Sequence, residues 1–189
     1  MDKQAMAVWK SKLQTLIERK AKNISWKPPE EGWIKINSDS TYKLGVACAG
    51  VVVKYKNGSI IYASTAQHHC LDPLSAECLA ILHACHIASK LKNVKTILES
   101  DCLEAITLIS GGSANTFWTT GPVVDVIKKM WTAWPSWIFM FNPRSCNRSA
   151  HALAHWGANC NFYGVVALDS IPATVFCDKW YPLLNFSYY

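Results

Sequence analysis

Several features that would assign a chain to a class at once are missing from this sequence. No run approaches the ~20 apolar residues that a membrane-spanning helix needs, and charged residues interrupt the apolar core that a secretory signal would require. None of the eight cysteines forms a Cys-x-x-Cys pair. A glycine-rich phosphate loop and a Ser-His-Asp signature are also absent. We therefore expect no membrane partner and an intracellular, non-secreted protein of the nucleus or cytoplasm, with reduced cysteines in its core.

The composition is that of a folded protein. Half of the 189 residues are hydrophobic and 12% are aromatic, which argues against disorder and allows one domain with short extensions. The net charge of +6 is compatible with a polyanionic partner.

Three segments are expected along the chain. Residues 1–29 combine an amphipathic helix over 3–22 with a linker that contains Pro28-Pro29, residues 30–162 form the main domain, and residues 163–189 form an aromatic-rich tail. The helix could be the remnant of an upstream domain or a dimer interface through Trp9, Leu13 and Leu16, so the oligomeric state stays open.

The main domain reads as alternating strands and helices. Strands are expected at 33–39, 45–55, 59–67, 94–99 and 137–142, and helices at 73–91, 101–109, 122–134 and from Asn147 to about Asn161. Asn57-Gly58 predicts a type I′ hairpin, and Asp72-Pro73 predicts a helix start. The order βββαβααβα indicates the α/β class, with a mixed five-stranded sheet flanked by helices.

Three carboxylates occupy informative positions in this pattern. Asp39 ends the first expected strand, Glu77 lies on the apolar stripe of a helix, and Asp101 follows a second strand at a strand-to-helix turn. If the strands are neighbours, the acids converge at one sheet edge. Clustered acids repel one another unless a cation lies among them, so the pattern points to a divalent-metal site.

Each acid also has an ordinary structural interpretation. Glu77, near the end of the stripe, could snorkel to solvent or pair with a lysine. Ser100 or Asp101 could cap the following helix, and Asp39 could be a turn residue. The order and context of all three acids favour the metal site.

The motifs in which these acids lie resemble a known family. The sequence resembles the ribonuclease H type-1 family, and especially the reverse-transcriptase-like ribonuclease H domains abundant in plants, over roughly residues 26–160. The motifs are Trp26-Lys27-Pro28-Pro29, Gly32-Trp33-Ile34-Lys35-Ile36-Asn37-Ser38-Asp39, Asn57-Gly58, Ser75-Ala76-Glu77-Cys78-Leu79-Ala80, Leu98-Glu99-Ser100-Asp101 and Asn147-Arg148-Ser149-Ala150-His151-Ala152-Leu153-Ala154.

The resemblance implies the ribonuclease H-like fold and endonucleolytic hydrolysis of the RNA strand of RNA–DNA hybrids. It implies that Asp39, Glu77 and Asp101 bind two Mg²⁺ ions, or Mn²⁺ in their place, in a two-metal mechanism. His151 falls where the family usually has a fourth Asp and is expected to assist catalysis. The partner would be an RNA–DNA hybrid or another nucleic acid, with contacts from Ser40, Asn147, Lys128, Lys129, Arg144 and Arg148.

Some residues depart from the family pattern. Ser40 replaces the usual Gly after the first Asp, His151 is not a carboxylate, and residues 111–121 contain no Lys or Arg that could form a basic protrusion. The alternative is therefore a catalytically weak or inactive, retrotransposon-derived domain that binds nucleic acid or a partner.

Overall fold

A computed structural model describes residues 26–91, 94–111, 118–170 and 175. The expected helix over 3–22 and most of the expected tail lie outside the described residues. The strands are β1 Trp33–Lys43, β2 Val46–Lys54, β3 Ile60–His69, β4 Lys95–Ser100, β5 Trp137–Phe141 and β6 Gly164–Val165. The helices are α2 Pro73–Lys90, α3 Leu103–Ile109, α4 Gly121–Ala133 and α5 Arg148–Cys160, with short 3₁₀ turns η1 Arg144–Cys146 and η2 Leu168–Ser170. None of the described helices combines the length and apolar character needed to cross a bilayer.

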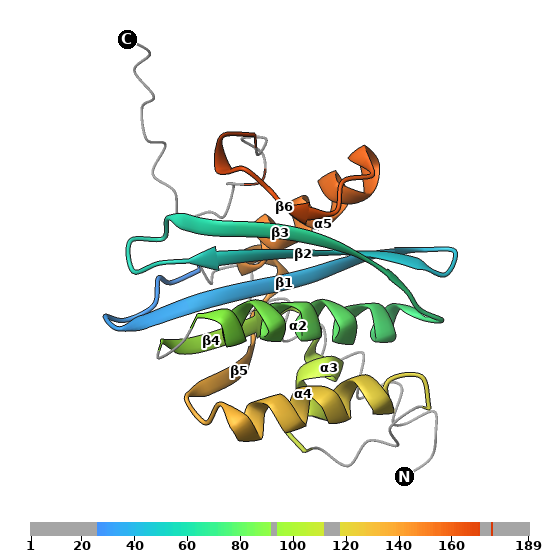
Figure 1. Ribbon diagram of the computed structural model, residues 1–189, viewed down its shortest axis with the longest axis horizontal. Coiled ribbons are helices and arrows are strands. Elements are labelled where there is room, and N and C mark those ends of the chain that lie inside the picture. The colour runs from blue at the N-terminus through green and yellow to red at the C-terminus, as the bar shows by residue number, and fades with distance from the viewer. Residues whose placement is uncertain (1–25, 92–93, 112–117, 171–174, 176–189) are drawn as a thin grey trace.

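The strands form one mixed sheet in the order β5-β4-β1-β2-β3-β6 (Figure 1). β1 pairs antiparallel with β2 and parallel with β4, so the central strand joins the opening meander to the later strands. The α/β class and the five expected strands are confirmed. The sixth strand was not expected, because β6 has only two residues, which is too short to show an alternating pattern.

The two opening hairpins differ in detail from the expectation. β1 continues to Lys43 instead of ending at Asp39, and Leu44 and Gly45, both at positive φ, form the two-residue turn into β2. At the second hairpin only Gly58 has positive φ, and its N–H donates to the Tyr55 carbonyl at 2.8 Å. The type I′ prediction at Asn57-Gly58 was therefore wrong, and a longer loop with one left-handed glycine makes this turn.

Helices cover the sheet on both faces. On one face α2, α3 and α4 enclose the larger core, to which Ile36, Val51 and Leu98 contribute. On the other face α5 packs on β1, β2 and β3 around Val52 and Leu153 (Figure 1). Successive residues of β1 therefore point alternately toward α2 and toward α5, which decides where each side chain of the site goes.

Gly50 on β2 lets α5 approach the sheet closely. A Cβ at this position would overlap the Ala154 amide nitrogen and lie 2.6 Å from the Ala150 carbonyl oxygen. Gly50 is the register partner of Asp39 on β1. The glycine thus brings α5 down beside Asp39.

Candidate metal centre

The structure brings the three predicted acids together. One ligand oxygen from each of Asp39, Glu77 and Asp101 lies within 4.8 Å of the others. Asp39 lies within β1 and not at its end, but it comes one residue after Ser38, the last β1 residue that pairs with β4. Asp101 directly follows β4, so both acids lie where the parallel pair ends. The predicted convergence at one sheet edge is confirmed.

Glu77 reaches this edge from the first turns of α2. The Asp72 carboxylate caps the helix by accepting a hydrogen bond from the Ser75 N–H at 2.8 Å, as the sequence predicted. Glu77 Oε1 accepts a hydrogen bond from Ser40 Oγ at 2.7 Å, whereas the buried Oε2 has no hydrogen-bond partner among the described residues. Among the described residues Glu77 therefore has no lysine partner, and one of its oxygens is left for a ligand.

Burial and the charge of Asp39 raise the pKa of Glu77 to about 8, although the hydrogen bond from Ser40 lowers it. A carboxyl with such a pKa is held ionised only by a cation or by high pH. Glu77 therefore has the properties of a ligand whose charge is compensated by a metal.

Asp101 is not the cap of α3. Cys102 takes that position, its Sγ accepting from the Ala105 N–H, and Ser100 Oγ accepts from the Cys102 N–H. The Asp101 carboxylate instead accepts a hydrogen bond from Asn147 Nδ2 at 2.9 Å. Burial and Asp39 raise the pKa of Asp101 to about 6, while Asn147 and Arg144 lower it.

His151 on α5 contacts the remaining acid. Its Nδ1 lies 2.6 Å from Asp39 Oδ2, and because a carboxylate only accepts, Nδ1 must carry the hydrogen. Arg144 Nη2 lies 3.2 Å from Nδ1 and 2.9 Å from Nε2, so the guanidinium lies against the ring and not along one lone pair. The fourth predicted residue is therefore part of the cluster.

The donor set fits a hard divalent cation. It consists of carboxylate oxygens, which Mg²⁺ and Mn²⁺ prefer, and it includes the buried and unpartnered Glu77 Oε2. Among the described residues, no lysine forms an ion pair with these three carboxylates, so their negative charge is not neutralised by a lysine. Asp39, Glu77 and Asp101 would hold the ion.

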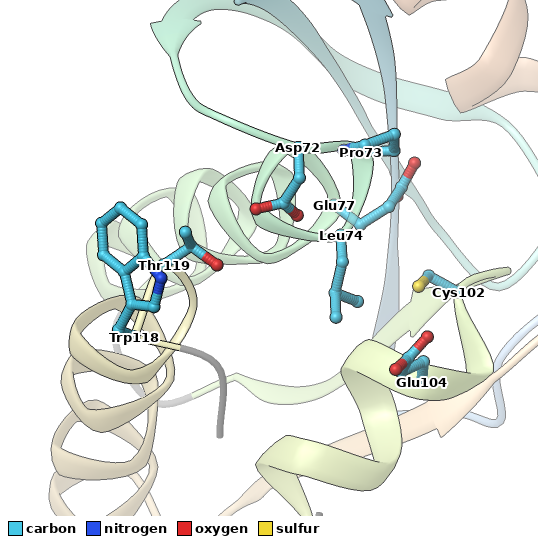
Figure 2. Close-up of a pocket in the computed structure, with 8 residues that line it drawn as sticks. All are labelled: Asp72, Pro73, Leu74, Glu77, Cys102, Glu104, Trp118 and Thr119. Carbon is cyan, nitrogen blue, oxygen red and sulfur yellow. The ribbon is translucent and has the colours of Figure 1, made fainter. Parts of the chain in front are cut away.

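A cavity of about 650 Å³ opens beside Glu77. Figure 2 shows it between the start of α2, the start of α3 and Trp118-Thr119 ahead of α4. Of the described residues that line it, Asp72, Glu77 and Glu104 are acidic and none is basic. This cavity does not attract phosphate by its own charge.

Basic residues line a second cavity on the other side of the cluster. It has a volume of about 390 Å³ and is lined by Arg144, Ser145, Arg148, His151 and Ala152. Lys128 and Lys129 lie instead on α4, which covers the opposite face of the sheet (Figure 1). The structure therefore separates the four basic residues expected to contact nucleic acid into two groups.

Asn147 and Ser40 differ from the nucleic-acid contacts that were expected. Asn147 has no exposed surface, and its Nδ2 donates to Asp101 and to the Ser38 carbonyl. Its side chain therefore does not cap α5 and is closed to nucleic acid in this structure. Ser40 is partly exposed, but its hydroxyl is engaged with Glu77.

Sequence reasoning missed a buried polar cluster behind the acids. Glu99 and Asn37 are almost fully buried and hydrogen-bonded to each other at 2.8 Å. Both lie in the quoted motifs, two residues before Asp101 and Asp39 respectively. The signal available was that two-residue spacing, which places Asn37 on the same face of β1 as Asp39 and places Glu99 two residues before the acid that follows β4.

Comparisons with known proteins agree with this architecture. The model of the reverse transcriptase-like family matches residues 37–157, more than half of the chain. No curated protein is close enough in sequence to count as a relative.

Among solved structures, the N-terminal ribonuclease H domain of a Mycobacterium tuberculosis protein is similar, with a TM-score of 0.61 and 18% identity, covering 68% of this chain and 94% of that one. Ribonuclease H1 of Halobacterium salinarum has a TM-score of 0.60 and 19% identity over 68% and 97% of the two chains. LC11-RNase H1, solved in complex with an RNA/DNA hybrid, has a TM-score of 0.60 and 17% identity over 68% and 97%. The chain has the ribonuclease H fold and belongs to the reverse transcriptase-like family.

Proposed function

We propose that this protein is a divalent-metal-dependent endonuclease that hydrolyses the RNA strand of RNA–DNA hybrids. The observation that carries the proposal is the convergence of Asp39, Glu77 and Asp101 within 4.8 Å, with one buried Glu77 oxygen left unpartnered. The fold supports the same substrate class, because one similar structure holds an RNA/DNA hybrid.

The metal is proposed to be Mg²⁺, bound as two ions, with Mn²⁺ able to replace it. When bound, the ions would supply Lewis-acid stabilisation of the phosphate and a lowered pKa for the attacking water. The residues of the chain provide the ligands and their geometry: Ser40 orients Glu77, Asn147 orients Asp101, and His151 is held by Asp39.

His151 is proposed to assist proton transfer on the side of the cluster that faces α5. Its Nδ1 is committed to Asp39, so Nε2 is the nitrogen that can exchange a proton with a reacting group. Arg144 against the same ring places a permanent positive charge where phosphate oxygens would lie.

The substrate backbone is proposed to lie over the cavity lined by Arg144 and Arg148. Both arginines are exposed and can neutralise phosphates beside the acid cluster. The acidic cavity of Figure 2 would then receive a part of the substrate only with metal present.

Cleavage of a labelled RNA–DNA hybrid tests the proposal. The wild type should cleave it with Mg²⁺ or Mn²⁺, and Asp101→Asn should lose cleavage while its unfolding midpoint stays close to that of the wild type. A duplex of DNA alone is the matched substrate control. Cleavage retained in Asp101→Asn would remove the assignment of the site.

The alternative, an inactive binding or interaction domain, makes a different prediction for the same samples. A folded wild type that binds the hybrid in the presence of metal but does not turn over would favour it. The observations behind this alternative are Ser40 in place of the usual Gly, the lack of Lys and Arg in residues 111–121 and the aromatic-rich tail.

An intracellular location, in the nucleus or cytoplasm, and a plant-type origin complete the proposal. The location is supported by the seven described cysteines, all of which are free, four of them buried.

A further inference from the structure

A buried carboxylate behind the metal centre has no part in the chemistry described above. Glu99 on β4 is only 3% exposed, and its side chain points to the same sheet face as Asn37 and Asp39. Buried acids are rare unless strong partners compensate the loss of water. Its partners therefore indicate what it does.

Glu99 is surrounded by donors. Oε1 lies 2.7 Å from Lys35 Nζ, and Oε2 accepts hydrogen bonds from Trp26 Nε1 at 3.1 Å, Asn37 Nδ2 at 2.8 Å and Asn142 Nδ2 at 2.9 Å. An ionised carboxylate offers acceptors alone, so every neighbour must turn a hydrogen toward it.

Because Glu99 needs donors, it fixes the orientation of the Asn37 side-chain amide, and Asn37 in turn fixes that of the Asn147 amide, which contacts Asp101. Asn37 Nδ2, held toward Glu99, also lies 3.2 Å from Asn147 Oδ1. With its oxygen facing Asn37, Asn147 turns its nitrogen toward Asp101 Oδ1 and the Ser38 carbonyl, both at 2.9 Å. A flipped Asn147 would place its oxygen against two other oxygens.

The side-chain amide of Asn37 is held in an orientation that leaves its own oxygen unsatisfied. Its Oδ1 is buried and has no hydrogen-bond partner among the described residues, although a buried unpaired oxygen is costly. The reverse orientation would set that oxygen against the Glu99 carboxylate and the Asn147 oxygen. Glu99 thus decides the direction of the amide at some cost to Asn37.

Trp26 closes the cluster from outside. It is 4% exposed. The Nζ atoms of Lys35 and Lys54 lie over its ring, 5.4 Å and 4.6 Å from the ring centroid respectively. Its indole donates to Glu99 but is not part of the path through Asn37 and Asn147. Trp26 and Asn37 therefore donate to the same oxygen of Glu99, but only Asn37 connects that oxygen, through Asn147, to Asp101.

We propose that Glu99 is a positioning residue for the metal centre: acting through Asn37 and Asn147, it holds Asp101 Oδ1 in a fixed direction. The catalytic consequence rests on the proposed function, whereas the orientation of Asn147 does not.

The experiment compares Glu99→Gln with Trp26→Phe. The first keeps the size of the side chain but allows a donor to face Asn37; the second removes one hydrogen bond to the same oxygen and leaves the path intact. If Glu99→Gln alone does not fold, the double variant Lys35→Met/Glu99→Gln removes the stranded lysine charge and serves in its place.

The first readout is hydrogen exchange of the Asn147 side-chain amide in ¹⁵N-labelled, metal-free protein, assigned by the loss of its signal in Asn147→Ser. Glu99→Gln should speed this exchange at least tenfold, and Trp26→Phe should leave it within twofold. An unchanged Asn147 signal in Glu99→Gln would overturn the positioning role, whether or not the protein is a nuclease.

The second readout is Mn²⁺ affinity together with kcat and KM on the hybrid. Glu99→Gln should weaken Mn²⁺ binding by about tenfold and lower kcat with KM little changed, as losses behind a metal ligand do. Trp26→Phe should lose stability but keep Mn²⁺ affinity. Equal Mn²⁺ affinity in the wild type and Glu99→Gln would refute the catalytic part, whereas a wild type without Mn²⁺ binding would refute the proposed function itself.

Discussion

The contact between Gly50 and α5 allows a sharp test of how the site is held together. A Cβ on Gly50 would meet three backbone atoms of α5: the Ala154 nitrogen, the Ala150 oxygen at 2.6 Å and the Ala154 Cα at 2.9 Å. Backbone atoms cannot move aside by changing rotamer, so Gly50→Ala must push the helix away from the sheet.

The expected loss of stability can be estimated from two opposing effects. Overpacking costs about 1–3 kcal/mol, and a backbone obstacle places this site at the upper end. Replacing glycine within a strand returns roughly 0.5–1 kcal/mol. The net loss is about 2 kcal/mol, or roughly 6 °C in the unfolding midpoint of a domain of this size.

Two other glycines provide matched controls. At Gly121, the first residue of α4, a Cβ meets nothing within 4 Å, so Gly121→Ala should not destabilise. At Gly157 the three nearest atoms belong to side chains, namely Thr65 Cγ2 at 2.8 Å, Cys48 Sγ at 3.0 Å and Thr65 Cβ at 3.1 Å, so no backbone atom lies as near as at Gly50. Denaturant unfolding of the three variants should rank Gly50→Ala well below Gly157→Ala, with Gly121→Ala highest.

The same change should also impair the proposed activity. Moving α5 lengthens the 2.6 Å contact between His151 and Asp39, so cleavage should fall more for Gly50→Ala than for Gly157→Ala at a temperature where both are folded. If Gly50→Ala were as stable as Gly121→Ala, the close packing of α5 on β2 and the argument built on it would be wrong.

Three further predictions follow from individual groups. Because the pKa of Glu77 is about 8 in the metal-free protein, metal binding at pH 7 should release roughly one proton. Calorimetry in buffers of different ionisation enthalpy measures this release, and Glu77→Gln should not show it. The raised pKa also means that ionisation of Glu77 lowers the free energy of unfolding of the metal-free protein as the pH rises from about 4.5 through 8. Asp72→Ala should cost about 1 kcal/mol at neutral pH through loss of the cap on Ser75. Burial raises the pKa of Asp72, but the hydrogen bonds from Ser75, Thr119 and Leu74 together outweigh it and lower the pKa, so that difference should vanish as the pH falls and the carboxyl is protonated. Arg148→Ala should reduce the salt dependence of hybrid binding by about one phosphate contact, whereas Lys129→Ala on the other face should leave it unchanged.

Much of the fold could be read from the sequence because local signals were strong. The alternating strands and the Asp72 cap each act within a few residues. The turn at Leu44-Gly45 was missed because a leucine at positive φ carries no turn signal of its own, and it is the antiparallel pairing of Lys43 with Val46 that holds it there.

The site was predictable only in part, for a related reason. Two acids at the ends of expected strands and a third on the apolar stripe of a helix indicate convergence, but a hydrogen-bonded path joins residues 37, 99 and 147, which are far apart in the chain. The Asn147 side chain could either cap α5 or hydrogen-bond Asp101, because the same amide group can make both kinds of contact. No local sequence pattern distinguishes the two. Burial decides between them, and burial depends on the tertiary packing.

Ser40 illustrates how the tertiary structure changes the meaning of a substitution. Ser40 stands where the family usually has Gly, and it was expected to contact nucleic acid. Because side chains alternate along β1, however, residue 40 points toward α2, while Asp39 points toward α5 and the arginine-lined cavity. Its hydroxyl donates to Glu77 and stabilises the charged form of a carboxylate that burial and Asp39 destabilise. Ser40 is therefore compatible with a working metal centre, and the departure that bears most on activity is His151, which lies beside the metal ligands themselves.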